Sequence, residues 1–120
     1  MVLVIAPWNY PLMTSVNHIV PALLSGNAVA IKHASRTPLC ADHFVDAFAA
    51  AGVPEGLVVS VPADHSTTSS LMARPEVNYM AFTGSVEGGR RVYQTAATNL
   101  IEVSSHSIPL HRQPLPFSLD

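Results

Sequence analysis

The sequence predicts an α/β fold built on a parallel sheet of four to five strands with helices on its flanks. Short apolar runs alternate with segments of helical periodicity, at the interval typical of strand–helix–strand units. The apolar runs are continuous rather than alternating, which is typical of strands buried on both faces. Gly, Pro and Ser gather in the turns between them. Together these three observations favour a sheet of the doubly wound kind, in which ligands bind beyond the carboxyl ends of the strands.

The first elements are the most clearly marked. An apolar run over residues 2–6 predicts a strand that ends at Pro7. Helical spacing over residues 13–24 predicts a helix, with Thr14 or Ser15 as its cap and Gly26 in its stop signal. The later elements alternate in the same way. They are a strand over 28–31, a helix over 37–51, a strand over 57–61, a helix that starts in the run 66–70 and ends near Pro75, a strand over 77–82, and a helix after Gly89 through Ala97.

Length and composition limit the classes of protein. A chain of 120 residues can form one domain with its own core, but is too short for a catalytic domain plus a cofactor domain. Apolar residues make up 48% and charged residues 12%, which fits a sheet buried on both faces and a piece of a larger protein. The six Lys and Arg residues are scattered, so we expect no nucleic-acid partner.

Targeting signals are not visible in the sequence. The longest apolar region, residues 16–31, is interrupted by polar residues, Pro21 and Gly26, so we expect no membrane-spanning segment. Met1 is followed at once by a strand-like run, without a basic region or a cleavage site. The sequence therefore predicts a cytoplasmic protein.

The segment A-P-W-N-Y-P-L at residues 6–12 holds the first candidate for chemistry. Two prolines restrict the backbone around Asn9 and favour a single direction for its amide. A fixed amide donor can stabilise an oxyanion, and one such donor lowers a barrier by roughly 3 to 4 kcal/mol. The alternative is an ordinary turn in which Asn9 only caps the next helix.

Two further sites sit where strands end. Lys32 ends the second strand and faces the crevice, where it can donate to ribose hydroxyls, or it can be a solvated charge. Gly84 and Ser85 follow the strand over 77–82 and open a helix, so their backbone N–H groups are suited to a diphosphate. The alternative is a connecting turn, because the spacing from Gly84 to Gly89 departs from G-x-G-x-x-G.

Other polar residues favour structural roles. Asp42 and Asp46 share one helical face, which is typical of a solvated surface rather than of paired acid and base groups. The single cysteine, Cys40, is expected to be a buried structural thiol. The six histidines show no ligand spacing, so the sequence predicts no metal site.

These motifs, taken in order, resemble the NAD(P)-dependent aldehyde dehydrogenase superfamily. The resemblance covers about residues 2–103 and is carried by five segments: P-W-N-Y-P-L from Pro7, P-A-L with G-N-A-V from Pro21, Lys32 followed by Thr37-Pro38, A-G-V-P from Ala51, and F-T-G-S from Phe82. It implies a Rossmann-like lobe that binds NAD or NADP, in an enzyme that oxidises an aldehyde to a carboxylic acid.

The resemblance implies a role for each matching residue. Asn9 would be the oxyanion amide, Trp8 would line the cofactor cleft, and Lys32 would contact the adenosine ribose. Ser85 would touch the diphosphate, while Gly84 and Gly89 would allow close approach of the backbone. Many members that prefer NAD carry Glu three residues beyond the lysine, where this chain has Ser35. A hydroxyl there does not repel a 2′-phosphate and Arg36 adds a positive charge, so we expect a slight preference for NADP.

The departures from the family are equally specific. After Val103 the family continues into a strand with a general-base Glu in L-E-L-G-G, and much later it carries the nucleophilic Cys. Here residues 104–120 read S-S-H-S-I-P-L-H-R-Q-P-L-P-F-S-L-D, which predicts a divergent, irregular tail in which His106 falls near the position of the Glu. Cys40 lies on a helix of the cofactor lobe, so the resemblance does not make it the nucleophile.

Two functions of different classes follow. The first is an aldehyde-oxidising enzyme of which this chain is an incomplete, truncated copy, inactive by itself. The second is a non-catalytic module that binds a dinucleotide or docks onto full-length subunits. An unrelated α/β domain is the third alternative.

Overall fold

The computed structural model describes residues 1–107, which form a five-stranded parallel sheet of strand order β3-β2-β1-β4-β5. The strands are β1 (Val2–Ala6), β2 (Val29–His33), β3 (Val58–Ser60), β4 (Tyr79–Gly84) and β5 (Glu102–Ser107). The predicted α/β class, with a parallel sheet and flanking helices, is confirmed.

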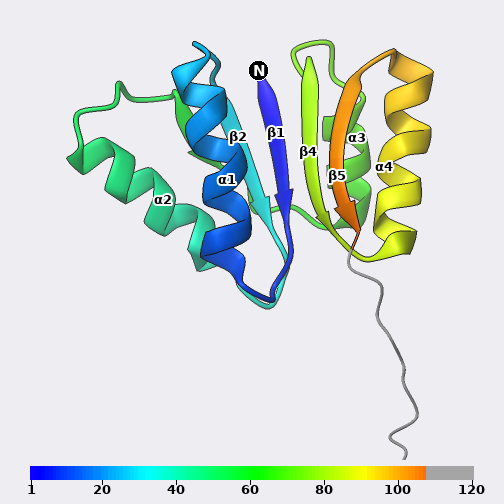
Figure 1. Ribbon diagram of the computed structural model, residues 1–120, viewed down its shortest axis with the longest axis horizontal. Coiled ribbons are helices and arrows are strands. Elements are labelled where there is room, and N and C mark those ends of the chain that lie inside the picture. Colours follow the sequence, from blue (N-terminus) through cyan, green and yellow to red (C-terminus); the bar gives the residue numbers. More distant parts are fainter. Residues whose placement is uncertain (108–120) are drawn as a thin grey trace, which may run out of the picture.

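Four helices cover the two faces of this sheet (Figure 1). They are α1 (Pro11–Leu24), α2 (Leu39–Ala50), α3 (His65–Met72) and α4 (Val86–Asn99). Helices α1 and α2 pack on one face, and α3 and α4 pack on the other. Within residues 1–107, no helix is long and apolar enough to cross a membrane.

Alternate residues of β1 supply both halves of the core. Val2 and Val4 face α1 and α2, whereas Leu3 and Ile5 face α3 and α4. All five residues of β1 are buried, which explains why its sequence is continuously apolar. The central strand therefore holds the two helical layers on one sheet.

The order of the strands creates one crevice. From β1 the chain moves outward through β2 to β3, and it then crosses back to place β4 on the other side of β1. The connections that leave β1 and β4 at their carboxyl ends diverge to opposite faces, since α1 and α4 lie on different sides. Such a switch in direction is where open α/β sheets bind ligands.

The start of α1 differs from the prediction. Neither Thr14 nor Ser15 caps the helix, because α1 begins at Pro11 and its N-cap is Tyr10, which has a left-handed φ of 52°. The hydroxyls of Thr14 and Ser15 instead donate to the carbonyls of Tyr10 and Pro11, one turn back. Proline at the first turn needs no hydrogen-bond acceptor for its nitrogen, so the helix starts earlier than its polar residues suggest.

Two strands are also displaced from their expected limits. Strand β2 begins at Val29 and continues past Lys32 to His33, and these last two residues pair with Ile5 and Ala6 of β1. Strand β4 begins at Tyr79 rather than at residue 77 and runs to Gly84. Polar residues at the ends of these strands belong to the sheet because their backbones pair with β1 or β5. This pairing is nonlocal, so a local sequence pattern does not reveal it.

The irregular tail expected from residue 104 is wrong for its first residues. Residues 104–107 belong to β5, which pairs with β4 from Tyr79 opposite Glu102 to Gly84 opposite Ser107. Ile101 and Val103 pack into the core under α4. Because this packing is combined with backbone pairing to β4, residues 102–107 form a strand although most of them are polar. The rest of the predicted tail, residues 108–120, lies outside the described residues.

A buried polar contact joins β2 to the first turn of α1. Ser15 is fully buried, and its single hydroxyl proton goes to the Pro11 carbonyl at 2.6 Å. Its oxygen therefore accepts from His33 Nε2, 3.1 Å away, which assigns the Nε2–H tautomer to His33. The contact ties the turn at residues 7–11 to the neighbouring strand.

This arrangement favours a neutral His33. Burial lowers the pKa of His33, and the charge of Lys32 lowers it further. The Pro7 carbonyl partly offsets this lowering, because it favours the protonated ring. Among the described residues, however, Nδ1 of His33 forms no hydrogen bond. Protonation of His33 in acid would therefore place a positive charge in a buried position.

The free energy of unfolding is therefore expected to depend on pH. Because the pKa of His33 is lower in the folded chain, the unfolded chain binds more protons in mild acid, and stability falls as the pH drops from about 7 to about 5. Urea unfolding at several pH values measures this loss. The pKa of His18 is also lowered, first by burial and then by His106, so His33→Gln should reduce the pH dependence without removing it.

His43→Gln, which removes an exposed imidazole from α2, controls for the substitution itself. An unchanged pH dependence in His33→Gln would contradict this account of the buried contact.

Candidate functional site

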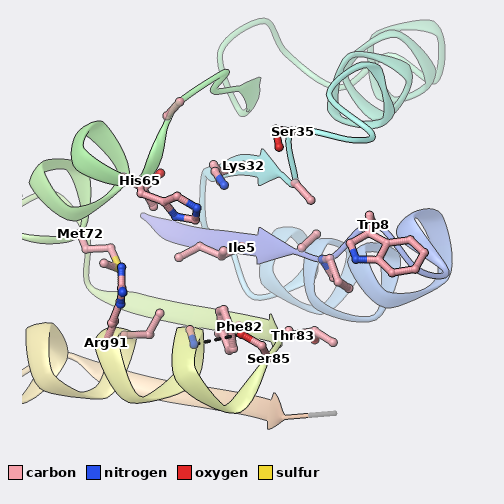
Figure 2. Close-up of a pocket in the computed structure, with 18 of the residues that line it drawn as sticks. Ile5, Trp8, Lys32, Ser35, His65, Met72, Phe82, Thr83, Ser85 and Arg91 are labelled. Carbon is pink, nitrogen blue, oxygen red and sulfur yellow. Dashed lines mark hydrogen bonds between the residues drawn. The ribbon is translucent and has the colours of Figure 1, made fainter. Parts of the chain in front are cut away.

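A cavity of about 540 Å³ opens at the carboxyl ends of the strands, on the face that carries α3 and α4. Its walls come from β1, β2 and β4, from the turns that follow them, and from α3 and α4 (Figure 2). Binding sites for small ligands commonly fall in this range of volume. We call this cavity the cleft.

Asn9 borders the cleft in the turn between β1 and α1. The alternative role of Asn9 as the helix cap is wrong, because Tyr10 is the N-cap and α1 has no side-chain cap. Among the described residues, no hydrogen bond involves the Asn9 amide. The amide is therefore available to a group inside the cleft.

Trp8 and Ser35 also line the cleft, from the turns after β1 and β2. The Trp8 indole is 53% exposed, and the Arg36 guanidinium carbon lies 5.2 Å from its ring centroid, within range of a cation–π contact. Arg36 itself is not among the residues that line the cleft. Ser35 also borders a second hollow of about 210 Å³, which lies beside His33 and Ser60.

Lys32 reaches the cleft from β2, one residue before the strand ends at His33. It pairs with Ile5 of β1, and Ile5 pairs in turn with Phe82 of β4, so these three side chains form a row on one face of three adjacent strands. Lys32 is only 8% exposed, and burial lowers the pKa of its ammonium group. Within residues 1–107, it has neither an ion pair nor a side-chain hydrogen bond.

The turn between β4 and α4 brings backbone N–H groups to the cleft. Ser85 is the N-cap of α4, and its hydroxyl accepts from Gly88 N at 3.1 Å (Figure 2). A Cβ on Gly84 or Gly88 would lie 2.7 or 2.9 Å from the Phe82 ring, so both glycines leave space for that ring. Gly88 lines the cleft, whereas Gly89 is buried outside the lining.

Sequence reasoning missed the wall formed by α3 and α4. This part of the lining consists of Thr68, Ser69 and Met72 of α3 with Arg91 and Val92 of α4. The polar run that begins at Ser66 had indicated only a helix start. The helix in fact starts at His65 with Asp64 as its N-cap, whose carboxylate accepts from Thr67 N at 2.7 Å.

The remaining candidates lie away from the cleft. Cys40 is only partly buried, at the start of α2, and does not line the cleft. His106 is on β5 opposite Thr83, with its ring centroid 6.1 Å from that of His18, and it does not line the cleft either. In the described part of the chain, no group of three or more His, Cys, Asp or Glu side chains could hold a metal ion.

The sequence also matches a known family over nearly all of the described residues. The model of the aldehyde dehydrogenase family covers residues 1–106. The chain belongs to the aldehyde dehydrogenase family. The resemblance drawn from the motifs of residues 2–103 is thereby confirmed.

Comparison with individual family members shows how much of their length this chain covers. Geranial dehydrogenase of Castellaniella defragrans is 40% identical over 100 residues, which are 83% of this chain and 21% of that protein. An NAD-dependent benzaldehyde dehydrogenase from Corynebacterium glutamicum is 36% identical, with a TM-score of 0.82 over 88% of this chain and 24% of that one. Succinic semialdehyde dehydrogenase from Streptococcus pyogenes, solved in complex with NADP+, is 28% identical, with a TM-score of 0.80 over 88% and 23%. The chain thus spans about a fifth of the length of its relatives.

Proposed function

We propose that the cleft binds NAD or NADP, and that the chain forms the cofactor-holding lobe of an aldehyde dehydrogenase. One observation supports this most strongly. Asn9 lies in the β1–α1 turn, Lys32 near the end of β2 and Ser85 at the start of α4, and all three border the same cleft. Membership in the aldehyde dehydrogenase family supports the assignment of NAD or NADP as the ligand of this cleft.

The residues of the cleft suit the parts of a dinucleotide. Lys32 lacks a partner among the described residues and can donate to ribose hydroxyls. The first N–H groups of α4 and the Ser85 hydroxyl can donate hydrogen bonds to the negatively charged oxygens of a diphosphate. Gly88 adds no side chain to this wall, so a ligand can approach the helix closely. Trp8 and Ser35 border the same space.

Asn9 is the proposed oxyanion donor. Its amide can hydrogen-bond the aldehyde oxygen as negative charge develops there, an interaction worth roughly 3 to 4 kcal/mol of barrier in comparable sites. The bound NAD(P) would accept the hydride when the aldehyde becomes a carboxylic acid. The role of this chain is to orient the carbonyl and the cofactor in one cleft.

Turnover needs groups that the cleft does not contain. The sequence holds a single cysteine, Cys40, which lies outside the cleft, and no Glu lines the cleft within the described residues. We therefore propose that this chain binds the dinucleotide without oxidising aldehydes alone. A module that docks onto full-length subunits is the second candidate, supported by exposed apolar side chains in the β1–α1 turn and the first turn of α1. These are Trp8, Tyr10, Leu12 and Met13, which are 52–71% exposed.

Preference for NADP is the finer part of the proposal. Ser35 presents a neutral hydroxyl to the cleft, and among the described residues the one carboxylate that lines the cleft is that of Asp64, which already caps α3. Arg36 contacts the ring of Trp8, which lines the cleft, and adds positive charge near this residue. One structural relative was solved with NADP+, and another is described as NAD-dependent, so the family fold accommodates both cofactors.

Substitutions at Ser85 test the diphosphate site. Ser85→Asp keeps an N-cap acceptor for Gly88 N but places a negative charge beside the diphosphate, so we expect folding to be retained and dinucleotide affinity to fall at least about tenfold. Ser85→Ala should cost about 1 kcal/mol of stability through loss of the cap and weaken binding less. Isothermal titration calorimetry and urea unfolding measure the two effects. Equal affinity of Ser85→Asp and the parent chain for NAD and NADP would overturn the proposed site.

A substitution at Ser35 tests cofactor preference. Ser35→Glu would place a carboxylate next to the proposed adenosine ribose, where it repels a 2′-phosphate and accepts from the ribose hydroxyls of NAD. We expect NADP affinity to fall about tenfold relative to NAD affinity. Ser35→Gln, similar in size but neutral, separates charge from bulk in the same titration. A parent chain that prefers NAD, or no difference between the two variants, would contradict the NADP preference.

A further inference from the structure

Lys32 is the only lysine in the sequence, and its surroundings are unusual for an ammonium group. Its neighbours across the sheet are Ile5 and then Phe82, and Met72 and Val92 form the helical wall of the same cleft. Figure 2 shows the lysine side chain entering this space from β2. The residue is 92% removed from solvent, since its exposure is 8%.

Asp64 contributes a carboxylate to the same cleft, but Lys32 forms no ion pair in the described part of the chain. Within residues 1–107, the two ion pairs join Arg74 with Glu76 and Arg91 with Glu87, so neither carboxylate is held by Lys32. Burial favours the neutral form of an amine and lowers the pKa of Lys32. The deprotonated amine of a lysine that faces a cavity is a nucleophile towards carbonyl carbon, and a lowered pKa makes that form easier to reach.

We propose that Lys32 captures aldehydes in the cleft as an imine. This activity goes beyond dinucleotide binding and does not require a bound cofactor. The lone pair of Nζ attacks the carbonyl carbon to give a carbinolamine, the carbonyl oxygen takes up the protons lost by the nitrogen, and one water molecule leaves as the C=N bond forms. No oxidant or reductant takes part, and hydrolysis reverses the step.

The walls of the cleft indicate which aldehydes fit. Ile5, Met72, Phe82 and Val92 provide apolar and aromatic contacts, and a volume of about 540 Å³ exceeds that of one aromatic ring with an aldehyde group. Aromatic aldehydes are therefore the proposed class.

Reductive trapping with benzaldehyde and sodium cyanoborohydride tests the proposal, because the reagent converts an imine to a stable secondary amine. The chain carries two kinds of amine, Lys32 and the α-amino group of Met1, which donates to Asn78 Oδ1. Peptide mapping by mass spectrometry assigns the benzyl label to one or the other. The same reaction in urea supplies the reference for an unfolded chain.

We expect the fold to reverse the preference between the two amines. In an unfolded chain the α-amino group reacts first, because its ordinary pKa is about 8 and that of lysine about 10.4. In the folded chain, most of the label should appear at Lys32, and it should be lost from that peptide in Lys32→Arg, which retains the positive charge. Circular dichroism confirms that the variant is folded.

Dinucleotide separates this proposal from the proposed function. Saturating NADP should protect Lys32 if both are correct. Labelling at Lys32 without protection would support imine formation and overturn dinucleotide binding at this lysine. If calorimetry shows NADP binding, but the benzyl label is divided between Lys32 and the α-amino group of the folded chain as it is in urea, the proposed function stands and imine formation is overturned.

Discussion

The parallel pairing of β1 with both β2 and β4 is the constraint on which the rest of the structure depends. It places the carboxyl ends of three strands at one edge of the sheet, and the reversal of direction at β1 sends the following connections to opposite faces. The turn with Asn9, the end of β2 with Lys32, and the first turn of α4 with Ser85 meet there because the backbone ladder leaves them no other position.

The cleft combines apolar walls with polar groups that the fold does not satisfy. Ile5 and Phe82 continue the core to the edge of the sheet, while the Asn9 amide and the Lys32 ammonium project beside them without partners among the described residues. Unpaired polar groups in partly buried positions cost free energy, and a ligand that satisfies them recovers it. The same features support both proposals, the dinucleotide site and the reactive lysine amine.

Local sequence signals predicted the strands and helices that are buried or capped in an ordinary way, and most of the cleft residues at strand ends. They failed where contacts distant in sequence decide the outcome. Strand β5 has a polar sequence and exists through its pairing with β4, and Pro11 opens α1 although Thr14 and Ser15 are better caps in isolation. The α3 wall of the cleft, with Thr68 and Met72, depends on how two helices pack over the sheet, which no motif of the sequence encodes.

The most direct measurement of the central claim is a titration of ¹⁵N-labelled protein with NADP, followed by amide chemical shifts. The account predicts saturable changes at the carboxyl edge of the sheet, at Asn9, Lys32, Ser85 and Gly88, while amides at the opposite edge, such as those of Val29 and Val58, keep their positions. Changes confined to that opposite edge, or none at saturating NADP, would contradict it.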